Sequence, residues 1–225
     1  MQSESVWASI LTGFRYMWGN TGLRLMVLVN AAVTLLLMGP IMVGIPVLAD
    51  QRLPEGAVAY GLLMSAYAGG SLGGYLLAGS LPRPNGAAMS RYMVLLIAWF
   101  GVVIGSLGLI RSTWVDFGLM LVLGLANGFL VITLISWLQA RTPKDMLGRI
   151  MSILMFSSTG LAPVSQAIAG AVIKLDLTLL FVLAGGLTVL LALWTAFQHG
   201  LAEVGESLAT SGSVKGPDLP PAGQL

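Results

Sequence analysis

The sequence predicts an all-α membrane protein with six transmembrane helices. Only 9% of the 225 residues are charged and 56% are hydrophobic, whereas soluble domains carry about 25% charged residues. Six stretches without a charged residue are each long enough to cross a hydrocarbon core of about 30 Å as a helix. Because unpaired backbone groups are costly in lipid, each stretch is expected to be helical.

The spanning domain is expected to cover residues 21–199. Its first helix contains Pro40 and Pro46 and its fifth contains Pro163, and each proline removes a backbone hydrogen bond and favours a kink. The fourth helix is expected to begin near Trp114, which leaves Asp116 at the membrane interface. The predicted spans lie at about 25–49, 57–82, 92–110, 114–138, 150–173 and 177–198.

Two further segments flank this domain. In residues 1–20, apolar side chains recur at helical spacing from Trp7 to Trp18. This pattern predicts an amphipathic helix that lies in the membrane interface or packs as a stub on the first span. Residues 200–225 are rich in serine, glycine and proline, a composition that predicts a disordered cytoplasmic tail.

The lysines and arginines are distributed unequally between alternate loops. Eight of the eleven lie in the N-terminal segment, the second and fourth loops and the tail, whereas Arg52, Arg111 and Lys174 lie in the other loops. Because cytoplasmic loops carry an excess of cations, both termini are expected to be cytoplasmic. The sequence pI near 9.2 reflects these loop cations and does not indicate nucleic-acid binding.

Two motifs resemble those of a known transporter family. Residues 143–152 are PKDMLGRIMS, and residues 60–63 and 69–74 are YGLL and GGSLGG. The first resembles the P-x-x-x-x-G-R-[VI]-M-S signature between the tenth and eleventh helices of major facilitator superfamily (MFS) transporters. The second resembles the glycine-rich eighth helix of the same family. Leu147 departs from the family pattern, which usually has a basic residue before the Gly-Arg pair.

The resemblance covers residues 5–198 and only the C-terminal half of such a transporter. It implies a six-helix MFS half that contributes to export of a small molecule (a drug, macrolide or siderophore) across the bacterial cytoplasmic membrane. Proton-coupled transport (antiport) would then need an N-terminal six-helix half as partner, whereas a second copy could supply only the other wall of the substrate path. The alternative, from another class, is a truncated, non-transporting remnant or a membrane scaffold.

Polar residues inside the spans are sparse. Asn127 lies near the middle of the fourth span, and Asn30 and Thr34 form an i, i+4 pair in the first. Transporter sites usually lie near the bilayer midplane, and the resemblance implies that these two helices line the central cavity. Asn127, Asn30 and Thr34 are therefore the predicted substrate-cavity residues. Alternatively, each amide simply bonds a neighbouring helix.

The charged segment between the fourth and fifth spans is a candidate cytoplasmic gate. The resemblance implies that Arg149 acts there together with Asp145, Gly148 and Arg141. In the alternative interpretation, Arg149 anchors the helix end by reaching the lipid headgroups.

Several glycines show the small-x-x-x-small spacing that lets two helices approach closely. The predicted helix-packing residues are Gly69, Gly70, Gly73, Gly74, Gly124 and Gly128. Packing within the chain is favoured over a dimer interface, which stays open as the alternative.

No enzymatic activity, cofactor or metal site is expected. Residues 69–73 fit the G-x-S-x-G pattern around Ser71, but the only histidine, His199, follows the last span. A nucleophile and its base must come within about 3 Å, and these two residues differ in depth by more than about 10 Å. No Asp, Glu, Lys, Arg or His lies inside a span, so the group that couples transport to protons is expected in the partner half.

Overall fold

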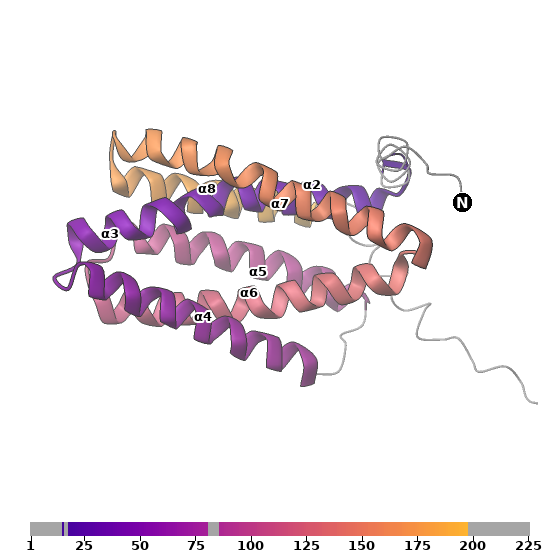
Figure 1. Cartoon of the computed structure of the whole chain (residues 1–225), viewed down its shortest axis with the longest axis horizontal. Helices are drawn as coiled ribbons and strands as arrows, with labels where there is room; N and C mark the ends of the chain where they lie inside the picture. Colours follow the sequence, from indigo (N-terminus) through magenta and orange to yellow (C-terminus); the bar gives the residue numbers. More distant parts are fainter. Residues whose placement is uncertain (1–14, 16–17, 81–85, 198–225) are drawn as a thin grey trace, which may run out of the picture.

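A computed structural model describes residues 15, 18–80 and 86–197, and within these ranges every regular element is a helix (Figure 1). The π-helix η1 joins α2 to α3 without interruption, so the elements form six rods that run side by side. The elements are α2 (Thr21–Gly39), η1 (Pro40–Gly44), α3 (Ile45–Arg52), α4 (Ala57–Ser80), α5 (Gly86–Leu107), α6 (Thr113–Arg141), α7 (Lys144–Ile173) and α8 (Leu177–Ala196). The all-α fold class is therefore confirmed.

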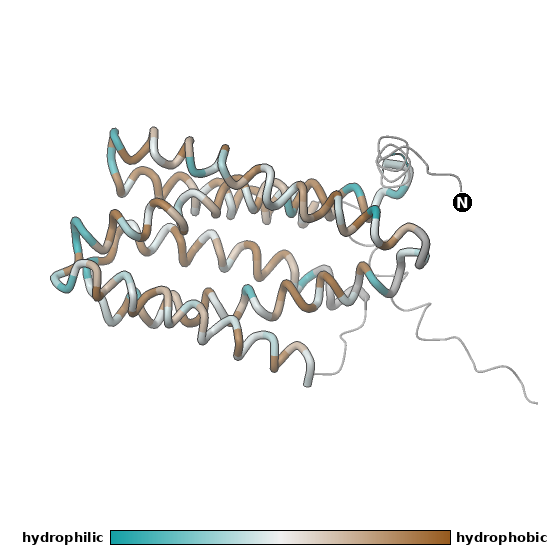
Figure 2. Tube along the Cα trace, viewed as in Figure 1, coloured by the Kyte–Doolittle hydropathy of each residue, from teal (hydrophilic) through white to brown (hydrophobic). Residues whose placement is uncertain are grey.

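Four of the rods are long and apolar enough to cross a membrane: Thr21–Arg52, Thr113–Ser136, Met146–Ile173 and Leu177–Ala196. Helix α4 has 24 residues without a charge, but its glycines, serines and tyrosines make it less apolar. In α5 the apolar part, Arg91–Leu107, is shorter. Polar residues gather at the two ends of the bundle and apolar residues between them (Figure 2). The chain therefore has the character of a membrane-embedded helical protein, and crossing by α4 and α5 stays a prediction.

A helix lies at each predicted span, but the ends differ: several helices extend beyond the predicted ends, whereas α5 stops at Leu107, before the predicted residue 110. Helix α2 begins at Thr21 because the side chain of Asn20 accepts a hydrogen bond from the Leu23 N–H at 3.1 Å. Helix α7 begins at Lys144 instead of residue 150, so the predicted charged loop is reduced to two residues. Charged residues mark the edge of the hydrocarbon core, and a helix can continue past that edge into the headgroups. The predicted helix in residues 1–20 and the tail 200–225 fall outside the described residues, apart from residues 15 and 18–20.

The six rods pair in a regular way. The most extensive contacts join α2 to α7, α4 to α6 and α5 to α8. Successive rods run in opposite directions (Figure 1). With the rods numbered 1 to 6 along the chain, these pairs are 1 with 5, 2 with 4 and 3 with 6. If rods 1, 2 and 3 change places with rods 4, 5 and 6, respectively, the same three pairs result. Because successive rods are antiparallel, this exchange relates rods that run in opposite directions.

Each of the three main pairs crosses at small residues. A Cβ at Gly39 would overlap the backbone of Ser165 on α7, and a Cβ at Gly124 would overlap the backbone of Tyr67 on α4. Between α5 and α8, a Cβ at Gly101 would lie 2.6 Å from the carbonyl oxygen of Gly185. Close backbone approach of this kind increases van der Waals contact, which drives helix association in lipid.

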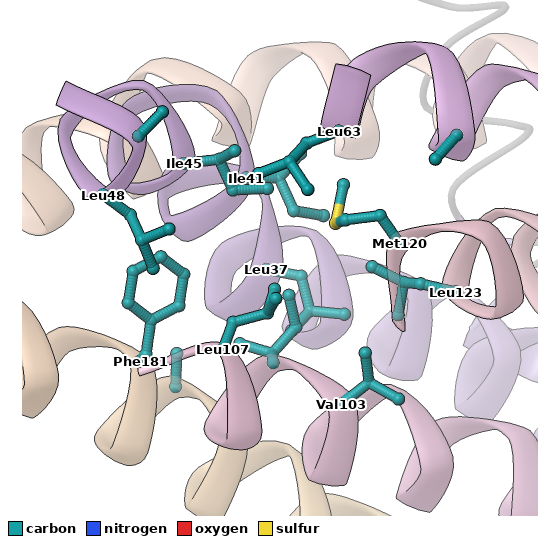
Figure 3. Close-up of a cluster of buried hydrophobic side chains, with 14 of the residues drawn as sticks. Leu37, Ile41, Ile45, Leu48, Leu63, Val103, Leu107, Met120, Leu123 and Phe181 are labelled. Carbon is teal, nitrogen blue, oxygen red and sulfur yellow. The ribbon is translucent and has the colours of Figure 1, made fainter. Parts of the chain in front are cut away.

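The larger of two clusters of buried apolar side chains lies toward one end of the bundle. A cluster of buried side chains joins η1 and α3 to α4, α5, α6 and α8, and includes Leu48, Leu63, Leu107 and Phe181 (Figure 3). A smaller cluster of Leu23, Val27, Leu138 and Ile150 joins α2, α6 and α7 near the other end.

Candidate functional site

A cavity of about 400 Å³ lies between the two apolar clusters. Its volume is within the range of about 300–1,000 Å³ that is typical of small-molecule sites. Helices α2, α5, α6 and α7 contribute most of its wall, and η1, α4 and α8 contribute one residue each. The lining residues are Gly22, Leu25, Met26, Val29, Asn30, Val33, Thr34, Leu37, Met38, Ile41, Tyr67, Met93, Val94, Ile97, Phe100, Asn127, Leu130, Val131, Leu134, Ser158, Thr159, Ala162 and Thr195.

All three predicted cavity residues lie in the wall of this one cavity. Asn30 and Thr34 belong to α2, and Asn127 belongs to α6. They come together because α2 and α6 border the same space, although the two asparagines are almost 100 positions apart in sequence. The structure thus places the polar residues of the first and fourth rods around a common volume.

The two asparagines have different surroundings. The Asn30 carboxamide donates a hydrogen bond to the Ser158 hydroxyl of α7 at 2.9 Å, so this residue does connect two helices, as the alternative interpretation expects. Asn127 is half-buried, and its side chain makes no hydrogen bond to any other described residue. A carboxamide offers two N–H donors and a carbonyl acceptor. Asn127 therefore presents unused hydrogen-bonding groups at the cavity wall.

Four further polar residues line the cavity and were not predicted from the sequence. They are Tyr67, Ser158, Thr159 and Thr195. The adjacent polar residues 157–159 near the middle of a predicted span were a signal that could have identified two of them. Thr195 donates its hydroxyl hydrogen to the Ala192 carbonyl at 2.8 Å and is already satisfied.

Asp116 has a feature that was not predicted from the sequence. Its position in the first turn of α6 agrees with the predicted helix end, but the side chain is 0% exposed. Neither carboxylate oxygen has a hydrogen-bond partner among the described residues. The nearby Glu55 carboxylate accepts instead from the Thr113 hydroxyl. Asp116 therefore lies at the end of its helix, as predicted, but its carboxylate is buried among protein atoms.

The candidate gate residues lie at the junction of α6 and α7. Asp145, Gly148 and Arg149 belong to the first turns of α7, and Arg141 is the last residue of α6. Arg149 is half-buried and lies 3.9 Å from the sulfur of Met146. Gly148 is exposed, and a Cβ there would meet no atom within 4 Å. The side chains of Arg141 and Asp145 lie outside the described part of the structure, so a gate stays a prediction.

The candidate packing glycines divide between two faces of α4. Gly70 and Gly74 lie against α6, where Gly124 and Gly128 in turn lie against the backbone of α4. In contrast, a Cβ at Gly69 or Gly73 would meet no described atom within 4 Å. These last two glycines therefore do not serve packing within the described part of the chain, which differs from the prediction.

Ser71 lies at the crossing of α4 and α6. Its hydroxyl donates to the Tyr67 carbonyl at 2.9 Å, one turn earlier in α4, and the residue is 7% exposed. His199, the base that a serine nucleophile at Ser71 would need, lies outside the described residues.

The fold and the site define a class: an all-helical, membrane-type bundle with a partly open, mostly apolar cavity that has a few polar groups in its wall. Comparisons of the chain with protein-family models, with curated proteins and with solved structures find no match. The resemblance to MFS exporters therefore depends on the sequence motifs alone.

Proposed function

We propose that this chain is one six-helix half of a small-molecule exporter of the MFS type. In this proposal the cavity between α2, α5, α6 and α7 is part of the substrate path, and Asn127, Asn30 and Thr34 contact the substrate. The observation that carries the proposal is the position of Asn127, a half-buried amide without a partner among the described residues at the wall of a ligand-sized cavity.

The helix pairing supports a transporter over a scaffold. If rods 1, 2 and 3 change places with rods 4, 5 and 6, respectively, the contact of α2 with α7 becomes the contact of α6 with α4. Many transporters are built from such inverted three-helix repeats, and their substrate sites lie near the bilayer midplane at the repeat interface. Asn127 lies close to the middle of α6, and the cavity borders both repeats.

A partner is part of the proposal. One six-helix half provides one wall of a path that alternates between two sides of a membrane, and a second half or a second copy would provide the other. The cavity wall contains no Asp, Glu, Lys, Arg or His among the described residues. Coupling to protons, which uses such groups, is therefore assigned to the partner. The cation distribution between loops supports cytoplasmic termini, and the motif resemblance supports a location in the bacterial cytoplasmic membrane.

Efflux of a fluorescent compound from bacterial cells tests the proposal. The full chain is co-expressed with an N-terminal six-helix half, and the Asn127→Leu variant is compared with the parent chain. Loss of the unpaired amide is expected to lower the efflux rate about five- to tenfold, the effect of one hydrogen bond to substrate, while the amount of folded protein stays the same.

Gln139→Leu is the matched control. It makes the same change of an amide to leucine on α6, but Gln139 is exposed and lies outside the cavity wall. Its efflux is expected to equal that of the parent. Equal efflux from a folded Asn127→Leu variant and the parent would exclude a substrate contact at Asn127. If the unmodified chain and the co-expressed N-terminal half produce no efflux, the non-transporting alternative is favoured.

A further inference from the structure

We propose that the cavity selects an uncharged amphipathic molecule and excludes organic cations, with the Asn127 carboxamide as the hydrogen-bonding group that orients the ligand. The inference is based on the proposed function, because it assigns the class of substrate to the same site. It follows from three features of the cavity wall: its lack of charge, the distribution of its polar groups and the flexibility of its apolar side chains.

The first feature is electrostatic. None of the lining residues carries a formal charge, and the charged residues of the described chain lie near helix ends or in the connections between helices. An ion that enters an apolar cavity loses its hydration, and without an opposite charge the loss costs several kcal/mol. A neutral molecule of the same shape avoids this penalty.

The second feature is the position of the polar groups. On one side of the cavity, the α2–α7 pair provides Thr34 and the hydrogen-bonded Asn30 and Ser158. On another side, the α4–α6 pair provides Tyr67 and Asn127. Apolar side chains of α5, such as Ile97 and Phe100, lie in the same wall. A ligand that fills this space needs an apolar body with hydrogen-bonding groups at its periphery.

The third feature is the set of methionines in the wall. Met26, Met38 and Met93 come from α2 and α5, and methionine side chains adapt to irregular shapes because they are unbranched and have three rotatable bonds. The wall can therefore fit apolar bodies of different outline. Selection then depends on charge and on the hydrogen bond to Asn127, and depends less on shape.

Two dyes with one scaffold test this assignment. Nile red is uncharged and carries a carbonyl group, whereas Nile blue has the same fused ring system with a cationic iminium group in the corresponding place. Binding of each dye to the purified full chain in lipid nanodiscs is measured by fluorescence, and the signal of empty nanodiscs is subtracted. We expect Nile red to bind at least about tenfold more tightly than Nile blue, because of the desolvation penalty of the cation.

Variants identify the cavity as the place of binding. Val131→Trp fills the cavity from α6 and is expected to abolish the Nile red signal, and Met93→Trp does so from α5 if the first variant does not fold. Asn127→Leu is expected to weaken Nile red binding about five- to tenfold through loss of one hydrogen bond. Gln139→Leu, outside the wall, is expected to leave binding unchanged.

The outcomes distinguish the inference from the proposed function. Nile blue binding that equals Nile red binding, and that is lost in the tryptophan variants, would overturn the neutral-ligand assignment and leave a ligand cavity in place. Nile red binding that Asn127→Leu does not weaken would overturn the role of that residue. If neither dye shows a signal that the tryptophan variants remove, while the parent chain is folded, both the inference and the proposed cavity function fail.

Discussion

The Ser165 hydroxyl lies between two backbone groups of α2: it accepts a hydrogen bond from the Gly39 N–H at 2.7 Å and donates one to the Leu35 carbonyl at 2.6 Å. A regular α-helix would pair these two backbone groups directly. The residue that follows, Pro40, has no N–H to donate to the turn before it, and η1 begins there. A side chain inserted into the helical ladder and a proline together account for the irregular backbone of the first rod.

The first prediction concerns this bridge. Ser165→Ala is expected to lower the free energy of unfolding of the purified chain by about 1–3 kcal/mol, because it leaves two buried backbone groups without their side-chain partner. Ser157→Ala on the same helix is the matched control, since the Ser157 hydroxyl is buried and has no partner among the described residues. That variant is expected to be neutral or slightly stabilising. Equal stability of the two variants would show that the bridge contributes nothing.

The second prediction concerns the two faces of α4. Gly124→Ala and Gly128→Ala place a Cβ into the backbone of α4 at Tyr67 and Ser71, and overpacking of this kind costs about 1–3 kcal/mol. Gly69→Ala adds a Cβ where no described atom lies within 4 Å, and the higher helix propensity of alanine favours folding by about 0.5–1 kcal/mol. Thermal unfolding in detergent measures both effects. Destabilisation by Gly69→Ala would instead indicate a contact of that face with another chain.

Hydrophobic length was sufficient to predict that a helix lies at each of the six stretches, although α5 ends at Leu107, three residues before the predicted end. It could not predict how each helix is rotated about its axis. The glycines at 69 and 70 were indistinguishable in the sequence, yet only Gly70 faces α6. The burial of Asp116 was missed for the same reason.

Polar residues were more informative than apolar ones for the site. Asn30, Thr34 and Asn127 were singled out because polar side chains are rare within spans, and the structure places all three at one cavity. The depth of a residue follows from its distance along the helix, at about 1.5 Å for each position. The neighbour that each residue meets depends on which helices pair, and the chain carries no local signal for that pairing.

The third prediction concerns Asp116. Because its carboxylate is fully buried and has no hydrogen-bond partner among the described residues, a neutral side chain of the same shape should be tolerated better than the charged one. Asp116→Asn is expected to leave the free energy of unfolding at pH 7 unchanged or to raise it by about 1 kcal/mol or more. Asp50→Asn, at an exposed position near the same end of the bundle, is expected to change it by less than about 0.5 kcal/mol. A clear loss of stability in Asp116→Asn alone would show that the carboxylate has a charged partner.

The fourth prediction concerns the orientation of the chain in the membrane. The sequence contains no cysteine, so a single introduced cysteine can be labelled with a membrane-impermeant maleimide from one side of the cell membrane. The positions follow from the structure. Gly56 is unsuitable because its φ of +54° would strain any other residue, and Asp176 caps α8 by accepting from the Leu179 N–H at 2.8 Å. Ser112 makes no side-chain capping bond, and Leu175 is 77% exposed.

Ser112→Cys and Leu175→Cys lie in the connections that follow α5 and α7, whereas Gly19→Cys lies near the opposite end, before α2. The excess of cations at the end that contains residue 19 favours a cytoplasmic location for it. Labelling of intact cells is therefore expected at residues 112 and 175, and labelling at residue 19 is expected only after the cells are opened. Each variant is denatured and labelled in parallel, so that a weak signal is not mistaken for an inaccessible position. The reverse pattern would invert the proposed orientation, and labelling of residues 112 and 175 from different sides would contradict the passage of both α6 and α7 between the two faces of the membrane.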